Sequence, residues 1–156
     1  QQSSGWQTNY VTGGSVGDTD RMNGRLQLDW QASDSLNFLL SAHYGYNNSD
    51  VLLYKADNIL TTEEDAFASE PRTAGAGNDP RMKLRSSGVS LTANWEIAPD
   101  VTLTSISAYE HFSRLHREDT DGTSLSYLDS TYDNEIDQYS QELRIAYSGD
   151  VRFKRS

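Results

Sequence analysis

The residues best suited to chemistry near neutral pH are three histidines, His43, His111 and His116. His111 and His116 fall near the end of a predicted strand, where they are placed to contact a ferric cargo. The alternative is that both are ordinary solvated side chains. No nucleophile elbow, phosphate-binding loop or metal-ligand pair accompanies them. An aspartate–histidine site around His111 or His116 is a remote option, and the sequence does not predict an enzyme.

Two charged groups offer binding chemistry. Arg72, Arg81, Lys83 and Arg85 gather towards the end of the first long connection of the chain, and such a cluster attracts an anionic chelate or the phosphates of lipopolysaccharide. The alternative is that these charges protect a strand edge from unwanted pairing. Asp119 and Asp121 form a short acidic turn that is a calcium candidate, but the spacing of an EF-hand is missing. A solvated acidic loop is the simpler interpretation of this turn.

Composition limits the class of protein. The net charge is −10 and the sequence pI is about 4.6, whereas binding nucleic acid requires a basic surface. There is no cysteine, which excludes a disulfide framework, thiol catalysis and cysteine-ligated zinc within this chain. Only 35% of the residues are hydrophobic and the mean hydropathy is −0.71. Both values are low for a protein with a large private core.

The elements that would position these residues are strands. In the stretch 88–96, Val89, Leu91, Ala93 and Trp95 alternate with polar residues, a period of two that is typical of a half-buried strand. A turn at positions 99 and 100 leads into a second strand. There Ile106 falls on the opposite parity to the apolar residues that open the strand, so either a bulge switches the parity or Ile106 faces inward. The predicted strands are about 6–12, 22–31, 36–47, 84–96, 101–114, 136–147 and 151–156.

Short and long connections alternate strictly along the chain, with long loops at 48–83 and 115–135. In an up-and-down sheet, this places all short turns at one end and all long loops at the other, as in bacterial outer-membrane barrels. Strands of about 10–13 residues also exceed the usual length in soluble proteins and match a tilted bilayer crossing. We therefore predict an all-β fold, an antiparallel up-and-down sheet in which residues 1–156 form part of a transmembrane β-barrel domain.

Aromatic residues near the strand ends support the same prediction. An interface between lipid and water favours tryptophan and tyrosine, since these rings are apolar with one polar edge. The interval from Tyr139 to Tyr147 is eight residues, about 26 Å along a strand and roughly 20 Å in height once tilted. The predicted belts are Trp30, Trp95 and Tyr147 beside the short turns, and Tyr44, Tyr46, Tyr109 and Tyr139 towards the long loops.

Two runs, Leu103–Tyr109 and Tyr139–Ile145, resemble segments of TonB-dependent outer-membrane receptors. Arg25 and Leu26, ahead of the turn at Ser33, add to this resemblance, which extends from about residue 13 to 147. It implies a 22-stranded barrel with an N-terminal plug, driven by TonB and the proton-motive force. The implied cargoes are ferric siderophores, haem, cobalamin or glycans. We expect the chain to be a fragment without the plug and without the short box that TonB grips.

The sequence therefore predicts part of a receptor in the outer membrane of a Gram-negative bacterium. Its expected partners are outer-membrane lipid, its own plug, TonB and a siderophore or similar solute, and no cofactor is predicted. Two alternatives remain open, a passive porin and a soluble carbohydrate-binding β-sandwich.

Overall fold

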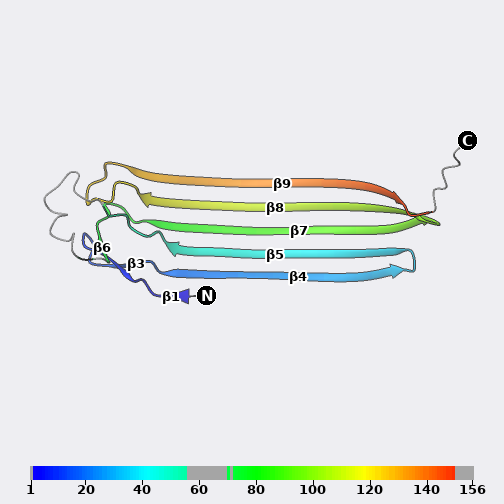
Figure 1. Ribbon diagram of the computed structural model, residues 1–156, viewed down its shortest axis with the longest axis horizontal. Coiled ribbons are helices and arrows are strands. Elements are labelled where there is room, and N and C mark those ends of the chain that lie inside the picture. The colour runs from blue at the N-terminus through cyan, green and yellow to red at the C-terminus, as the bar shows by residue number, and fades with distance from the viewer. Residues whose placement is uncertain (1, 56–69, 71, 150–156) are drawn as a thin grey trace, which may run out of the picture. The chain divides into compact units, whose positions relative to one another are not determined.

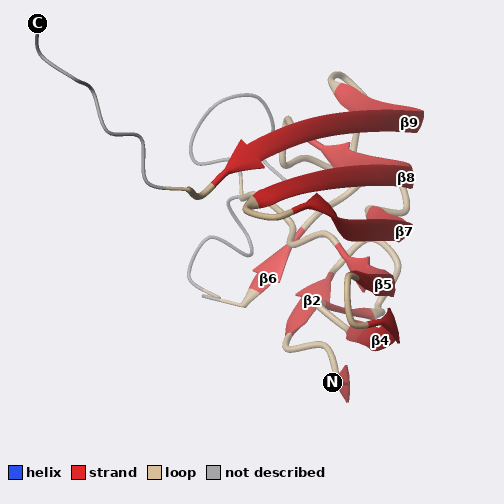
Figure 2. Ribbon diagram, turned by 90° about the vertical axis from the view of Figure 1, so that its right-hand side faces the viewer, coloured by secondary structure: helices blue, strands red, loops and turns tan. Residues whose placement is uncertain are grey.

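The computed structural model describes residues 2–55, 70 and 72–149, so the predicted strand 151–156 lies outside it. Regular secondary structure in the described part is strand throughout, joined by turns and loops (Figure 2). The strands are β1 (Gln2–Ser3), β2 (Gln7–Asn9), β3 (Ser15–Val16), β4 (Thr19–Ser33), β5 (Leu36–Asp50), β6 (Thr73–Ala74), β7 (Arg81–Ala98), β8 (Val101–Asp119) and β9 (Asp129–Tyr147).

The long strands form one antiparallel sheet of six strands in the order β1-β4-β5-β7-β8-β9 (Figure 1). The long strands β4, β5, β7, β8 and β9 pair in the order in which they follow along the chain, and the short β6 between β5 and β7 belongs to the other sheet. A second sheet of three short strands has the order β3-β2-β6, with β2 and β6 parallel. The prediction of an all-β fold with an antiparallel up-and-down sheet is confirmed.

Several strands extend farther than the sequence pattern predicts. β9 begins at Asp129 instead of about 136, and β8 continues to Asp119 instead of about 114. Most residues of these extensions are polar, and Leu115 and Tyr132 are too isolated to form an apolar face, so periodicity gives no signal for them. Cross-strand contacts hold them instead: the Thr120 N–H donates to the Leu128 carbonyl at 3.0 Å, and the rings of His116 and Tyr132 meet edge to face.

The turn between β7 and β8 has the geometry that its residues favour. Asp100 adopts a φ of 62°, the left-handed conformation that aspartate tolerates better than most residues. The Asp100 carbonyl accepts a hydrogen bond from the Ser148 N–H at 2.8 Å. The reversal at positions 99 and 100 is therefore tight and is tied to the end of the neighbouring strand.

The parity of Ile106 follows from two contacts between β7 and β8. The Thr104 hydroxyl donates to Asn94 Oδ1 at 2.8 Å, and the Glu110 carboxylate lies directly over Gly88. Both contacts belong to one antiparallel register, because Glu110 lies six residues after Thr104 on β8 and Gly88 lies six residues before Asn94 on β7. A single bulge between them would shift the second contact by one residue. Ile106 therefore faces the same side as Thr104, and the inward alternative is correct.

The chain divides into two compact units, which are described separately. One unit, here called the span unit, comprises 24–44, 87–111 and 137–156. The other, the loop unit, comprises 1–23, 45–86 and 112–136. Among the described residues, the buried apolar side chains are Leu53, Ala74 and Ala76, all in the loop unit. The Gln7 amide stabilises this small core by donating to the Leu53 carbonyl at 2.9 Å and accepting from its N–H at 2.8 Å.

Candidate functional site

One face of the span unit is apolar and exposed, and we call it the apolar face. Its members alternate along each strand, so they share a side of the sheet. Leu26 is 69% exposed and Leu143 is 68% exposed, values far from those of a protein core. Exposed large hydrophobic side chains of this face are Leu26, Leu28, Trp30, Leu40, Tyr44, Val89, Leu91, Trp95, Ile97, Tyr139, Leu143, Ile145 and Tyr147. An exposed apolar patch of this size is typical of a surface that contacts a protein, a membrane or a ligand.

The predicted aromatic residues of the span unit lie on this face. Trp30 stacks on Phe38 of β5 with ring centroids 5.5 Å apart, and Tyr109 packs on Tyr139 with centroids 4.7 Å apart. The Tyr109–Tyr139 contact joins β8 and β9 at the edge of the face nearer the long loops. Trp95 and Tyr147 lie near the opposite, short-turn ends of their strands and are exposed. Tyr46 belongs to the loop unit, where its hydroxyl donates to Asp20 at 3.3 Å.

The polar residues within the apolar face satisfy one another. Gln141 Nε2 donates to the Ser105 hydroxyl at 3.0 Å, and the Ser107 hydroxyl donates to Gln141 Oε1. Polar groups that contact lipid must find partners within the protein, because hydrocarbon offers none. This three-residue cluster meets that requirement.

The opposite side of the span unit, the polar face, carries mostly hydrophilic and small side chains, with Leu39 and Ile106 as larger apolar members. His43 Nε2 lies 3.2 Å from Glu110 Oε2, although their strands β5 and β8 are separated by β7. Gly88 makes this pair possible, because a Cβ at that position would collide with the Glu110 carboxylate. Asn37 donates to Asp29 Oδ1 at 2.5 Å on the same side of β4 and β5. The polar face is therefore a network of hydrogen bonds and ion pairs.

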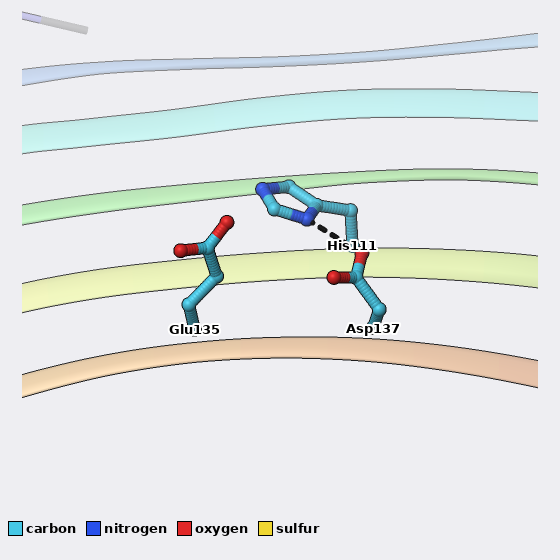
Figure 3. A group of neighbouring side chains, drawn as sticks. All are labelled: His111, Glu135 and Asp137. Carbon is cyan, nitrogen blue, oxygen red and sulfur yellow. Dashed lines mark hydrogen bonds and ion pairs between the residues drawn. The ribbon is translucent and has the colours of Figure 1, made fainter.

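The two histidines predicted to share a site lie on opposite faces of β8. His111 Nδ1 is 2.9 Å from Asp137 Oδ1, and the Tyr109 hydroxyl donates to the same oxygen at 2.6 Å. Figure 3 draws the His111–Asp137 pair with Glu135, which precedes Asp137 by two residues and so shares its side of β9. His116 faces the other way, with Nε2 3.2 Å from Glu118 Oε2. A common ferric ligand cannot bridge His111 and His116.

The acidic turn of the loop unit brings three carboxylates together. Oxygens of Asp119, Asp121 and Asp129 lie within 4.8 Å of one another, a grouping that could hold a metal ion. The pKa of Asp119 is raised: burial is the largest cause and the charges of Asp121 and Asp129 add to it, whereas hydrogen bonds from the N–H groups of Gly77 and Gly122 oppose it.

Asp121 is tied to its own loop more tightly than its neighbours. Burial acts to raise the pKa of Asp121. Hydrogen bonds from the Thr123 hydroxyl and from the N–H groups of Leu128, Thr123 and Tyr127 together outweigh burial, so the pKa is lowered. The distances to these N–H donors run from 2.7 to 3.1 Å. Because both carboxylate oxygens of Asp121 accept hydrogen bonds from its own loop, this aspartate holds the 120–128 loop in its conformation.

Arg81 lies between two carboxylates. Its guanidinium lies 3.7 Å from both Asp50 and Asp79. Arg81, Lys83 and Arg85 share one side of β7, as their spacing requires. Arg81 also lines two cavities of the loop unit, of about 460 and 360 Å³, together with Asp50.

Sequence reasoning missed the partners of these side chains. Asp50 and Asn78 fall in the stretch predicted as a long loop, and nothing in their spacing connects them to Arg81. Asp137 joins His111 through the β8–β9 register, which no local motif encodes. The opposite orientation of His111 and His116 was available from the sequence, because their numbers differ by an odd count on one strand.

No protein-family model matches the chain, and no curated protein matches it either. Among the described residues, no helix is long and apolar enough to cross a membrane.

Proposed function

We propose that this chain is a segment of an outer-membrane β-barrel and that it serves, within a TonB-dependent receptor, in the energised uptake of a scarce solute. The observation that carries the proposal is the exposed apolar face of the span unit. Leu26, Leu40, Leu91 and Leu143 are between 37% and 69% exposed. In a soluble sandwich, the corresponding side chains pack against a second sheet of the same chain.

The dimensions of the apolar face fit a bilayer. Eight residues separate Tyr139 from Tyr147, about 26 Å along the strand. A tilt of about 40° reduces this to a height on the order of 20 Å, close to the apolar band of outer-membrane barrels. The paired polar cluster at Gln141 supports the same environment, because an unpaired amide would be costly in hydrocarbon.

The choice of energised over passive uptake has its support in the sequence resemblance. The described part of the loop unit has its own small core, and loops positioned on such a scaffold are the kind of element that captures a solute. Capture by these loops, followed by passage through the lumen, is the mechanism that we propose. The energy source is the proton-motive force acting through TonB.

The test uses the whole gene product that carries this chain. We expect it to fractionate with the outer membrane, to require detergent for extraction, and to support solute uptake that stops when TonB is deleted or an uncoupler is added. Uptake that is insensitive to both treatments would identify a passive porin. Extraction without detergent would favour a soluble sandwich and refute the proposal.

A further inference from the structure

The loop unit contains a cavity whose polar groups are incompletely paired. Its volume is about 360 Å³, within the range in which proteins bind small molecules. It is formed by segments that are distant in sequence, and its polar lining is Asn9, Thr12, Ser15, Asp50, Asn78, Asp79 and Arg81. All of these residues belong to the loop unit.

Two polar atoms of this lining are shielded from solvent and have no hydrogen-bond partner. They are Asn78 Oδ1, which is an acceptor, and Arg81 Nε, a donor that lies 3.7 Å from Asp79 Oδ2, within ion-pair range but beyond hydrogen-bonding distance. Such atoms are uncommon in folded proteins, because leaving them unpaired costs stability. Their occurrence in two residues that line one cavity indicates a missing polar partner.

The surroundings fix both side chains in place. Asn78 Nδ2 donates to Asp129 Oδ1 at 2.5 Å and lies 3.4 Å from the Glu118 carbonyl. This contact sets the amide orientation, since a flipped amide would press its oxygen against the Asp129 carboxylate. Arg81 is held between Asp50 and Asp79. The acceptor and the donor are therefore preorganised.

The charge of the lining selects against anions. Asp50 and Arg81 line both this cavity and the neighbouring cavity of about 460 Å³. Across the two cavities, the charged residues are one guanidinium, Arg81, and four carboxylates, Asp18, Asp20, Asp50 and Asp79. An anionic chelate would meet this excess of negative charge and be repelled.

We propose that this cavity binds a neutral, hydroxyl-rich solute of the carbohydrate type. A hydroxyl group both donates and accepts, so the hydroxyls of one solute supply the complement of Asn78 Oδ1 and of Arg81 Nε. The Asp79 side chain lines the cavity and is 73% exposed, so it can turn towards solvent as a solute hydroxyl approaches Arg81 Nε. The inference names the class of solute for the uptake function and in that sense rests on it.

The experiment screens the whole gene product in detergent against an array of neutral di- to tetrasaccharides and their uronate counterparts. We expect binding to neutral members and weaker or no binding to uronates. The tightest neutral sugar is then titrated calorimetrically against variants. Arg81→Lys keeps the positive charge between the two aspartates but removes Nε, and Asn78→Ala removes the free acceptor.

We expect each of these variants to weaken binding by about tenfold or more, the usual effect of losing a hydrogen bond to a charged or buried group. Arg85→Lys is the matched control, because it makes the same exchange on the same strand outside the cavity, and its affinity should be unchanged. The folding of each variant is checked by its gel mobility in detergent, and Arg81→Lys alone still tests the proposal if Asn78→Ala does not fold. No neutral ligand, preference for uronates, or unchanged affinity of Arg81→Lys would overturn the proposal.

This outcome is separable from that of the proposed function. Equilibrium binding in detergent needs neither TonB nor a membrane potential. Sugar binding by a gene product that extracts without detergent would refute the receptor while leaving the cavity assignment intact. TonB-dependent uptake without binding of any neutral sugar would refute the cavity assignment and leave the receptor function intact.

Discussion

Placing a charge at the middle of the apolar face should destabilise the membrane-inserted protein strongly. Leu143 lies four residues from Tyr139 and four from Tyr147, about 13 Å along the strand from each, so it marks the centre of the band. An arginine at the midplane of an outer-membrane barrel costs about 2–4 kcal/mol. The Leu143→Arg variant should therefore lose roughly 30- to 700-fold in its folding equilibrium constant.

The assay is urea unfolding of the whole gene product in lipid vesicles, followed by gel mobility without boiling. Ser140→Arg is the matched control, because it adds the same charge to the polar face of the same strand, three residues away. Its unfolding free energy should change by less than about 0.5 kcal/mol. If Leu143→Arg is as mild as Ser140→Arg, the leucine contacts water, and the reasoning from exposure to lipid contact fails.

Three further predictions concern the turns and the polar face. Gly88→Ala should displace the Glu110 carboxylate and break its pair with His43, which should lower the unfolding free energy by about 1 kcal/mol. The loss should be smaller in a Glu110→Ala background, and a double-mutant cycle measures this coupling. Independent effects of the two substitutions would contradict the contact. Asp121→Asn should lower amide-exchange protection of the 120–128 loop about tenfold, since its nitrogen cannot accept the backbone N–H groups. Because the pKa of Asp121 is lowered in the folded protein, its contribution to stability is present above the ordinary carboxyl pKa and is lost as the pH falls through the lowered value. The amide-exchange protection of this loop in the wild-type protein at pH 5 should therefore equal that at pH 7. Asp100→Gly should raise the unfolding free energy by about 0.5–1 kcal/mol, because glycine adopts a φ of 62° without strain, and an unchanged or lower value in urea titration would contradict that reading.

The sequence predicted the middle of the sheet well because one face of each strand is apolar and the other is polar, which imposes a period of two. The alternation from Val89 to Trp95 placed β7, and the turn residues at 99 and 100 placed the hairpin. The strand extensions were missed because both of their faces are polar, so pairing is visible only through cross-strand partners. β1, β3 and β6 have two residues each, too few for any periodic signal.

The candidate sites were harder to predict than the strands. The order of short and long connections follows from local turn residues, whereas the cavity at Arg81 joins segments around positions 9–16, 50 and 77–81. Such a site depends on how loops pack, and loop packing leaves no pattern in a single sequence. The pairing of Glu110 with His43 across β7 is similar, since it depends on the absence of a side chain at Gly88.

The central claim, contact between the apolar face and acyl chains, is tested most directly by fluorescence quenching from within the bilayer. This chain contains no cysteine, so single cysteines introduced at successive positions 140–146 can each carry a fluorophore. Vesicles with doxyl-labelled acyl chains should quench the probes at 141, 143 and 145 and spare those at 140, 142, 144 and 146. Equal quenching at both parities, or quenching of the odd positions by aqueous iodide instead, would contradict the account.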